Sequence, residues 1–226
     1  MSMSTLRQRF IGFSIVGAVC LWGSVANASL LVDVTTPGDV LVALSNTAQG
    51  TPNHLATVGT GGGQHPAGEP ASAAIDNNQA TKYLNFGRTS VGFAVTPSMG
   101  ATYVTGLRFS AANDAPERDP ISFTLEGCNS PDALTEGFNG WTPIAYGFTG
   151  LTENPGRNAW QLVGTEASFA DAVPYTSYRL LITTVRTGSA NSMQVGEVEL
   201  LGCAVPEPAS LSLLAFASLL VRRRRI

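Results

Sequence analysis

Apolar and polar residues alternate with a period of two through much of the middle of the chain. This pattern, or a short apolar run, occurs at residues 30–34, 91–95, 103–109, 121–125, 141–146, 178–184 and 195–201. Alternation predicts β-strands with one buried face, because successive side chains of a strand point to opposite sides of a sheet. Apart from the two ends of the chain, no segment keeps an apolar stripe of period 3.6, so long helices are not expected.

Turn-forming residues separate the predicted strands. Gly, Pro, Asn and Asp gather at residues 59–63, 113–120, 129–140, 154–158 and 187–191. Residues 49–70 show no periodicity and are expected to form a long surface loop. Many short strands with turns between them predict an all-β fold of the β-sandwich type.

The first 28 residues are organised differently. Arg7 and Arg9 precede an apolar stretch at residues 10–25, and Ala26-Asn27-Ala28 follows it. A basic segment, an apolar segment and an A-x-A site in this order are typical of a secretory signal peptide. We therefore expect export, cleavage after Ala28 and a mature chain that starts at Ser29.

Residues 205–226 form a second signal with three parts. Pro206, Glu207 and Pro208 come first, an apolar run at 209–221 predicts a short hydrophobic helix, and the next four residues are arginines. Adjacent arginines resist translocation and should stay in the cytoplasm. The arrangement resembles the PEP-CTERM sorting signal of bacteria that export exopolysaccharide. An ordinary tail anchor is the alternative.

This resemblance implies a processing enzyme and a destination. In that family, an exosortase in the membrane recognises the Pro-Glu-Pro motif. The implied route is export, anchoring of the precursor in the inner membrane of a Gram-negative bacterium by the C-terminal helix, and transfer to the cell surface or extracellular matrix. The sequence therefore predicts a domain at 29–204 between a signal peptide and a sorting signal.

The charge of this domain limits its partners. Of 16 acidic residues only Glu207 lies outside 29–204, and of 13 basic residues Arg7, Arg9 and the four terminal arginines lie outside it. The domain thus carries 15 acidic and seven basic residues, a net charge of −8. Nucleic-acid binding requires a basic surface and is not expected.

Cys128 and Cys203 are the two cysteines of the domain. In an oxidising compartment two thiols can close a disulfide, and a bridge between them is one expectation. The other is a pair of free buried thiols, because the sequence does not give the distance between their Cα atoms.

A second resemblance lies in residues 73–84, which read AAIDNNQATKYL. This run is similar to the A-x-D-G-x-x-x-T-x-W signature of discoidin-like domains, with Asn77 in place of Gly and Tyr83 in place of Trp. The family includes the C domains of coagulation factors V and VIII and many carbohydrate-binding modules. The resemblance covers about residues 71–202 and implies a galactose-binding-like, jelly-roll β-sandwich.

The same resemblance implies one structural Ca²⁺ that ties an early loop to the last strand. Carried over by position, Asp76 and Glu197 supply carboxylates, Thr81 a hydroxyl, and the backbone near Ala74 and Asn78 carbonyl oxygens. Ca²⁺ takes about six to eight hard oxygen ligands in tolerant geometry. The alternative is that Asp76 and Thr81 cap a turn by hydrogen bonding to nearby amides.

The densest charged segment of the domain is a further candidate. It comprises Asn113, Asp114, Glu117, Arg118 and Asp119. It either lines a ligand groove at one end of the sandwich or forms a rigid loop in which Arg118 pairs with neighbouring acids. Trp141 and Trp160 leave a similar choice between sugar platforms and core residues.

Catalytic chemistry finds little support in the sequence. No G-x-S-x-G motif marks a nucleophilic Ser, Glu126 and Glu136 flank no recognisable cleft, and His54 and His65 lack a nearby third ligand for zinc. The expected function is a non-catalytic protein that binds carbohydrate or exopolysaccharide, or forms matrix, at the cell surface. A secreted polysaccharide-active enzyme and a structural envelope protein without a ligand are the alternatives.

Overall fold

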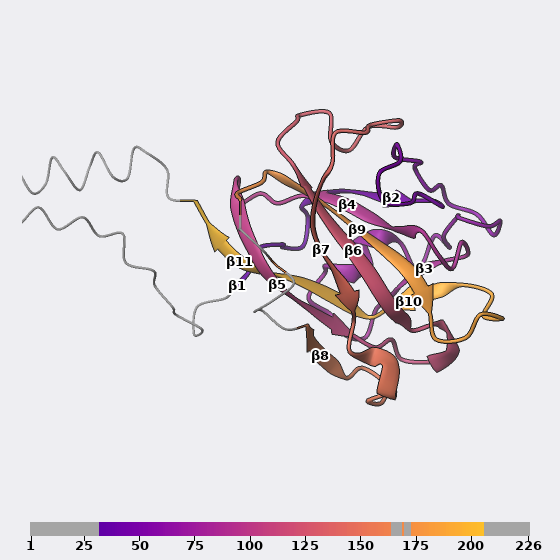
Figure 1. Cartoon of the computed structure of the whole chain (residues 1–226). Helices are drawn as coiled ribbons and strands as arrows, with labels where there is room; N and C mark the ends of the chain where they lie inside the picture. Colours follow the sequence, from indigo (N-terminus) through magenta and orange to yellow (C-terminus); the bar gives the residue numbers. More distant parts are fainter. Residues whose placement is uncertain (1–31, 164–168, 170–172, 206–226) are drawn as a thin grey trace, which may run out of the picture.

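The computed structural model describes residues 32–163, 169 and 173–205, and Figure 1 shows them as two packed sheets with long connecting loops. The predicted signal peptide with Ala28, the sorting motif at 206–208 and the apolar helix at 209–221 lie outside these residues. Within the described ranges, no helix is long and apolar enough to cross a membrane.

The strands of the described residues form three antiparallel sheets. One sheet has the order β2-β4-β9-β6-β7, a second has the order β1-β11-β5-β8, and β10 pairs with β3. In chain order the elements are β1 Val32–Asp33, β2 Val40–Leu44, η1 Ala71–Ala74, β3 Tyr83–Asn85, β4 Val91–Thr96, β5 Thr102–Ser110, η2 Pro116–Arg118, β6 Pro120–Cys128, β7 Thr142–Phe148, η3 Leu151–Glu153, β8 Trp160–Val163, β9 Ser177–Val185, β10 Met193–Val195 and β11 Glu197–Ala204, the η elements being short 3₁₀ helices.

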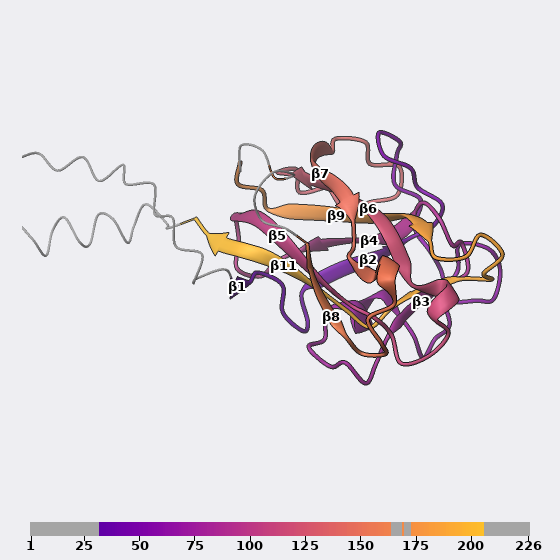
Figure 2. The ribbon, with the colours of Figure 1, turned by 60° about the horizontal axis from the view of Figure 1, so that its bottom comes forward.

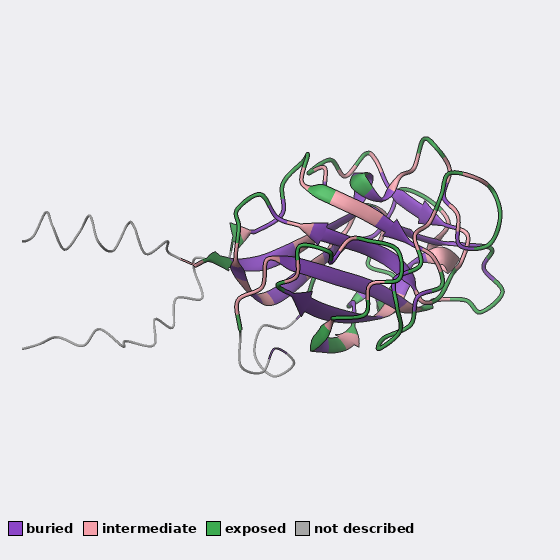
Figure 3. Cartoon of the chain, turned by 90° about the horizontal axis from the view of Figure 1, so that it is seen from above, coloured by how far each residue is buried: buried purple, intermediate pink, exposed green. Residues whose placement is uncertain are grey.

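The two larger sheets enclose one hydrophobic core. Alternation turns Phe123 and Leu180 inward from the five-stranded sheet, and Phe109 and Leu200 inward from the four-stranded sheet. The rings of Phe109 and Phe123 meet across the core with their centroids 5.4 Å apart. Figure 2 shows β7 and β9 in one layer and β11 and β8 in the other, and buried residues follow the strands in Figure 3. The prediction of an all-β sandwich is confirmed.

The predicted strands agree best where alternation is longest. The predictions at 91–95, 103–109, 121–125 and 178–184 fall within β4, β5, β6 and β9. The prediction at 195–201 is divided at Gly196, since β10 pairs with β3 and β11 pairs with β5. A Cβ at Gly196 would lie 2.9 Å from the Ala111 carbonyl oxygen, so the chain changes sheets where only glycine allows the backbone so close.

Two loops cover part of the outer face of the five-stranded sheet. Leu55 and Leu134 pack there on a small second apolar cluster of Leu44, Ala94 and Leu181. The fully buried Asn53 joins the loops, because its side-chain amide donates to the Ala133 carbonyl at 2.8 Å and its backbone N–H donates to the Phe138 carbonyl at 2.9 Å. Segment 49–70 is a long and largely exposed loop, as predicted, and Asn53 and Leu55 anchor its first part to the sheet.

A buried ion pair lies beneath these loops. The Arg179 Nε donates to Glu126 Oε2 at 2.5 Å, and the two side chains are 0% and 1% exposed. Arg179 also donates to the Thr51 carbonyl and to Asn53 Oδ1, each at 3.0 Å. The ring of Trp141 lies 5.2 Å from the guanidinium, and its Nε1 donates to Asn53 Oδ1 at 3.0 Å. Glu126 and Trp141 therefore have structural roles.

The predicted disulfide between Cys128 and Cys203 is contradicted. Both thiols are free within the described residues, with Cys128 buried and Cys203 exposed. Cys128 ends β6 opposite Ser177 of the five-stranded sheet, whereas Cys203 lies opposite Tyr103 in the other sheet. The two cysteines thus lie on strands of different sheets, and no bond joins them.

Candidate functional site

The loop that precedes β3 meets the start of β11 at one end of the sandwich. The Asp76 carboxylate accepts the N–H of Asn78 at 2.9 Å and the hydroxyl of Thr81 at 2.8 and 3.0 Å. Glu197, the first residue of β11, accepts the same Asn78 N–H at 2.7 Å through Oε1. The structure thus brings together all four residues of the predicted metal set, although Asn78 and Glu197 are 119 positions apart.

The turn between Asp76 and Asn78 depends on the residue that replaces glycine in the signature. Asn77 has φ = 58°, in the left-handed region. Asn occupies this region more readily than most residues other than glycine. The departure at Asn77 therefore preserves the backbone of the turn.

Glu197 is held in an unfavourable environment for a carboxylate. Burial, helped by the neighbouring Asp76 carboxyl, raises the pKa of Glu197 to about 8. The residue is 1% exposed, and its Oε2 is buried without a hydrogen-bond partner among the described residues. Two carboxyl groups this close either share a proton or need a cation between them.

The donor set of this site fits a hard cation in part. Asp76 and Glu197 supply carboxylate oxygens and Thr81 a hydroxyl, which are ligand types that Ca²⁺ prefers. The carbonyl of Asn78 already accepts the N–H and the hydroxyl of Thr81, at 3.0 and 2.7 Å. No group of three or more His, Cys, Asp or Glu side chains is gathered within the residues that the structure describes. Remaining ligands would have to be other backbone oxygens or water.

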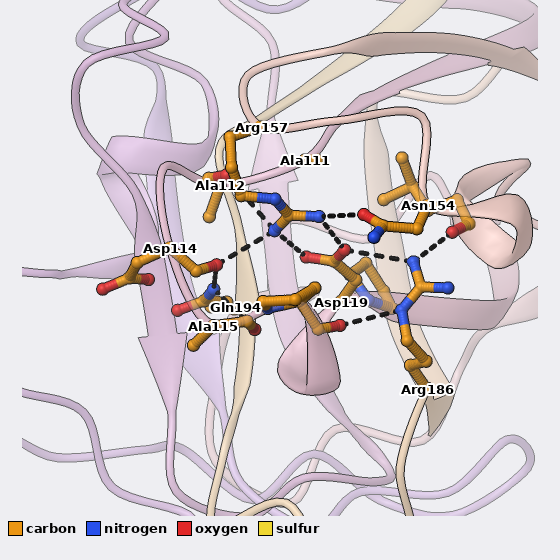
Figure 4. Close-up of polar contacts among 12 residues, drawn as sticks. Ala111, Ala112, Asp114, Ala115, Asp119, Asn154, Arg157, Arg186 and Gln194 are labelled. Atoms are coloured by element: carbon orange, nitrogen blue, oxygen red, sulfur yellow. Dashed lines mark hydrogen bonds and ion pairs between the residues drawn. The ribbon is translucent and has the colours of Figure 1, made fainter.

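The charged segment at 113–119 is built around one buried carboxylate, as Figure 4 shows. Asp119 is fully buried and accepts two hydrogen bonds from Arg157, at 2.9 and 2.6 Å, and one from Arg186 at 3.2 Å. The Asp119 carboxylate raises the pKa of Arg157. Arg157 also donates to Asn154 Oδ1 at 2.8 Å and to the Asp114 carbonyl at 2.9 Å. Asp119 therefore fastens three loops together.

Lys82 holds the other end of this segment. Its ammonium donates to Asp114 at 2.6 Å and to Gln194 Oε1 at 3.2 Å, and Glu69 lies at 3.5 Å. Burial raises the pKa of Asp114, but the hydrogen bond and charge of Lys82 outweigh it and hold that pKa below its usual value.

The other members of the charged segment are Asn113, Glu117 and Arg118. Arg118 has Glu117 as its neighbouring acid, with 4.0 Å between Nε and Oε1, and Asn113 is exposed. Basic side chains of the protein already pair with the carboxylates of Asp114 and Asp119. This supports the interpretation of the segment as a rigid loop more than its interpretation as a ligand groove.

Sequence reasoning missed one exposed surface. Tyr146 and Phe148 on β7 are 75% and 71% exposed and border a hollow of 490 Å³ on the five-stranded sheet. Residues 141–146 were predicted to be a strand, but alternation does not tell which of its faces is covered. Trp160 is half-buried on β8, with the guanidinium of Arg108 4.3 Å from its ring centroid.

Comparisons with known proteins give distant likenesses. No protein-family model and no curated protein matches the sequence. The chain is similar in structure to the family 32 carbohydrate-binding module of NanJ from Clostridium perfringens, solved with galactose, at 14% identity and a TM-score of 0.44, over 72% of this chain and 99% of that one. A fucolectin from striped bass, Morone saxatilis, matches at 14% identity and a TM-score of 0.49, over 79% and 51%.

A chitosan-binding module from Paenibacillus sp. IK-5 is a third such likeness. It matches at 15% identity and a TM-score of 0.45, over 77% of this chain and 100% of that one. At this level of similarity, the three proteins give no information about the ligand of this chain.

Proposed function

We propose that this chain is an exported, non-catalytic carbohydrate-binding protein of the cell envelope, with surface polysaccharide as its partner. The observation that supports this best is the cluster of Asp76, Asn78, Thr81 and Glu197. The resemblance to sugar-binding discoidin-like domains implied that these residues meet. Their contact across most of the domain agrees with that implication, and nothing in the local sequence requires it.

The proposal includes a structural Ca²⁺ at this cluster. Asp76 and Glu197 would hold the ion between their carboxylates, and Thr81 would add its hydroxyl. The ion would supply positive charge that keeps Glu197 ionised despite its burial. The buried, unpartnered Oε2 of Glu197 fits this role, and the loop would then be fixed to β11.

The proposed location rests on the sequence at the two ends of the chain. The A-x-A site that ends at Ala28 supports export, and Pro206, Glu207 and Pro208 support recognition by an exosortase-type enzyme. The apolar run at 209–221 would hold the precursor in the inner membrane until processing. Intact-mass measurement on envelope material tests this route. A mature start at Ser29 and loss of the four arginines are expected, and a dominant form that keeps them would favour a tail anchor.

The binding function is tested on the exported protein, purified from the periplasm of an expression host. Retention on glycan arrays or retardation in gels that contain host exopolysaccharide is the expected result. Release of reducing sugar from the polysaccharide would instead indicate an enzyme. Absence of binding to the host exopolysaccharide and to every arrayed glycan would overturn the proposal and favour a structural envelope protein.

A further inference from the structure

Loops cover the outer face of the five-stranded sheet near β2 and β4 and leave it open near β7, the opposite edge strand. The loops that carry Leu55 and Leu134 cover the part over β2 and β4. At the opposite edge, Tyr146 and Phe148 are both largely exposed although they belong to a strand. They are two positions apart on β7, so both rings project from the same side of the sheet, about 7 Å apart at a rise of about 3.4 Å per residue.

The register of the sheet places hydroxyl groups beside these rings. Tyr146 lies opposite Thr124 and Phe148 lies opposite Ser122 on β6. Ser122 Oγ is 2.6 Å from the hydroxyl of Thr183 on β9. A hollow of 490 Å³ lies over this area, and Gln49 from the covering loop forms one of its walls. Its polar lining therefore consists of hydroxyls and one amide.

We propose that this hollow binds a neutral sugar chain that runs across β6, β7 and β9. The inference rests on the proposed carbohydrate-binding function and gives that function a site. Aromatic ring faces carry negative charge density and suit the C–H faces of sugar rings. Ser, Thr and Gln side chains both donate and accept hydrogen bonds, as sugar hydroxyls require.

Charge favours a neutral chain over an acidic one. Among the described residues that line the hollow, none is ionisable near neutral pH. The domain at 29–204 has a net charge of −8, from 15 acidic and seven basic residues, and its field would repel a polyanion. Two exposed rings in succession along the strand also suit an extended chain that contacts both of them.

A second copy of the protein is the competing occupant, because β7 is an edge strand. Edge strands offer unpaired backbone groups to other chains. Two features oppose such pairing here: Pro143 within β7 lacks a backbone N–H, and the pairing of β6 with β7 has an irregularity between Leu125 and Glu126, of the kind that twists an edge away from partners.

The test compares the wild-type exported protein with a Tyr146→Ala/Phe148→Ala double variant. Affinity gel electrophoresis would use a soluble β-glucan, a galactomannan and, as the acidic probe, alginate. Leu162→Ala is the matched control, because Leu162 is an apolar residue, 60% exposed, on the edge strand of the other sheet. We expect wild type and control to be retarded by a neutral polysaccharide, and the double variant to lose at least tenfold in affinity with its melting temperature little changed.

The outcomes separate this inference from the function on which it rests. If wild type binds a neutral polysaccharide and the double variant binds it equally well, the site is wrong and the binding function stands. If wild type binds none of the probes and none of the arrayed glycans, both are wrong. Preference for alginate would overturn the neutral ligand, and conversion of a wild-type dimer to a monomer in the double variant, without a change in sugar binding, would assign the surface to a second copy.

Discussion

Replacing Glu197 by Gln should remove a pH dependence of stability that the calcium-free protein shows. The pKa of Glu197 is about 8 in the folded state, against a usual 4.5. Between these values the folded state keeps a proton that the unfolded chain has lost. The contribution to stability is therefore complete below about pH 4.5 and is lost as the pH rises to about 8.

The magnitude follows from the same difference. At about 1.36 kcal/mol per pKa unit, the full loss is on the order of 5 kcal/mol, and this is a ceiling because the Asp76 carboxyl shares the environment. Glu197→Gln resembles the protonated carboxyl, so the variant should match wild type near pH 5 and exceed it in stability at pH 8. Calcium requires the deprotonated form, so its stabilisation of wild type should grow over this range, to about 2.7 kcal/mol at a hundredfold excess over Kd.

Urea unfolding followed by tryptophan fluorescence, at pH 5, 6, 7 and 8 in EDTA and in millimolar Ca²⁺, measures both effects. Burial raises the pKa of Asp33 to about 6, so Asp33 also lowers the stability of the protein as the pH rises, at lower pH than Glu197 does. The Glu197→Gln variant keeps Asp33, so the difference in stability between wild type and variant leaves this contribution out. Glu199→Gln is the matched control, since Glu199 is on the same strand but pairs with Arg108 at 2.9 Å. A wild-type stability in EDTA that stays level or rises from pH 5 to 8 would refute the reasoning about Glu197. If Ca²⁺ stabilised the Glu197→Gln variant as much as wild type, the proposed ion at Glu197 would be refuted.

Three further outcomes are expected. Arg179→Ala should destabilise the protein by about 3–5 kcal/mol in urea unfolding, because it leaves Glu126 buried without its partner. A thiol reagent should modify Cys203 in the native protein and both cysteines after denaturation without reductant, because both are free and Cys128 is buried. Asn77→Gly should leave the melting temperature nearly unchanged, whereas Asn77→Val should cost about 1–2 kcal/mol, because φ is 58° there.

Each of these has a contrary result. An Arg179→Ala variant as stable as wild type would mean that Glu126 is not left as an uncompensated buried charge when its partner is removed. Absence of any thiol reaction in the denatured, unreduced protein would restore the disulfide between Cys128 and Cys203. Equal stability of the Asn77→Gly and Asn77→Val variants would show that the turn is not constrained at that residue.

Alternation predicted the central strands because each of them has one face in the main core. It failed for β2, whose sequence Val-Leu-Val-Ala-Leu is apolar throughout: Leu44 lies in the cluster on the outer face, while Ala43 belongs to the main core. A strand apolar on both faces has no period of two. The short strands β3 and β8 offer too few residues for any pattern.

The candidate site shows the same limits. Asp76, Thr81 and Glu197 were selected through the discoidin-like signature, since no local pattern connects a loop residue with one that follows it by more than a hundred positions. The role of Asp119 was not foreseen, because its partners Arg157 and Arg186 come from other loops. The exposure of Tyr146 and Phe148 was not predicted, because the sequence does not show which face of a sheet other segments cover.

The pairing of β1 with β11 has a mechanical consequence. Val32 lies opposite Gly202, so the chain enters and leaves the domain at the same end. A pull on the chain beyond Val205 would load β11 lengthwise, in shear against the hydrogen bonds that it makes with β5 from Glu197 to Ala204. Glu197 lies at the far end of that strand. The hydrogen bond that it accepts from the Asn78 N–H would therefore resist sliding of β11 at the end away from the pull. The opposite end of the sandwich would project outward from such a tether, about 25 Å from it at 3.4 Å per residue.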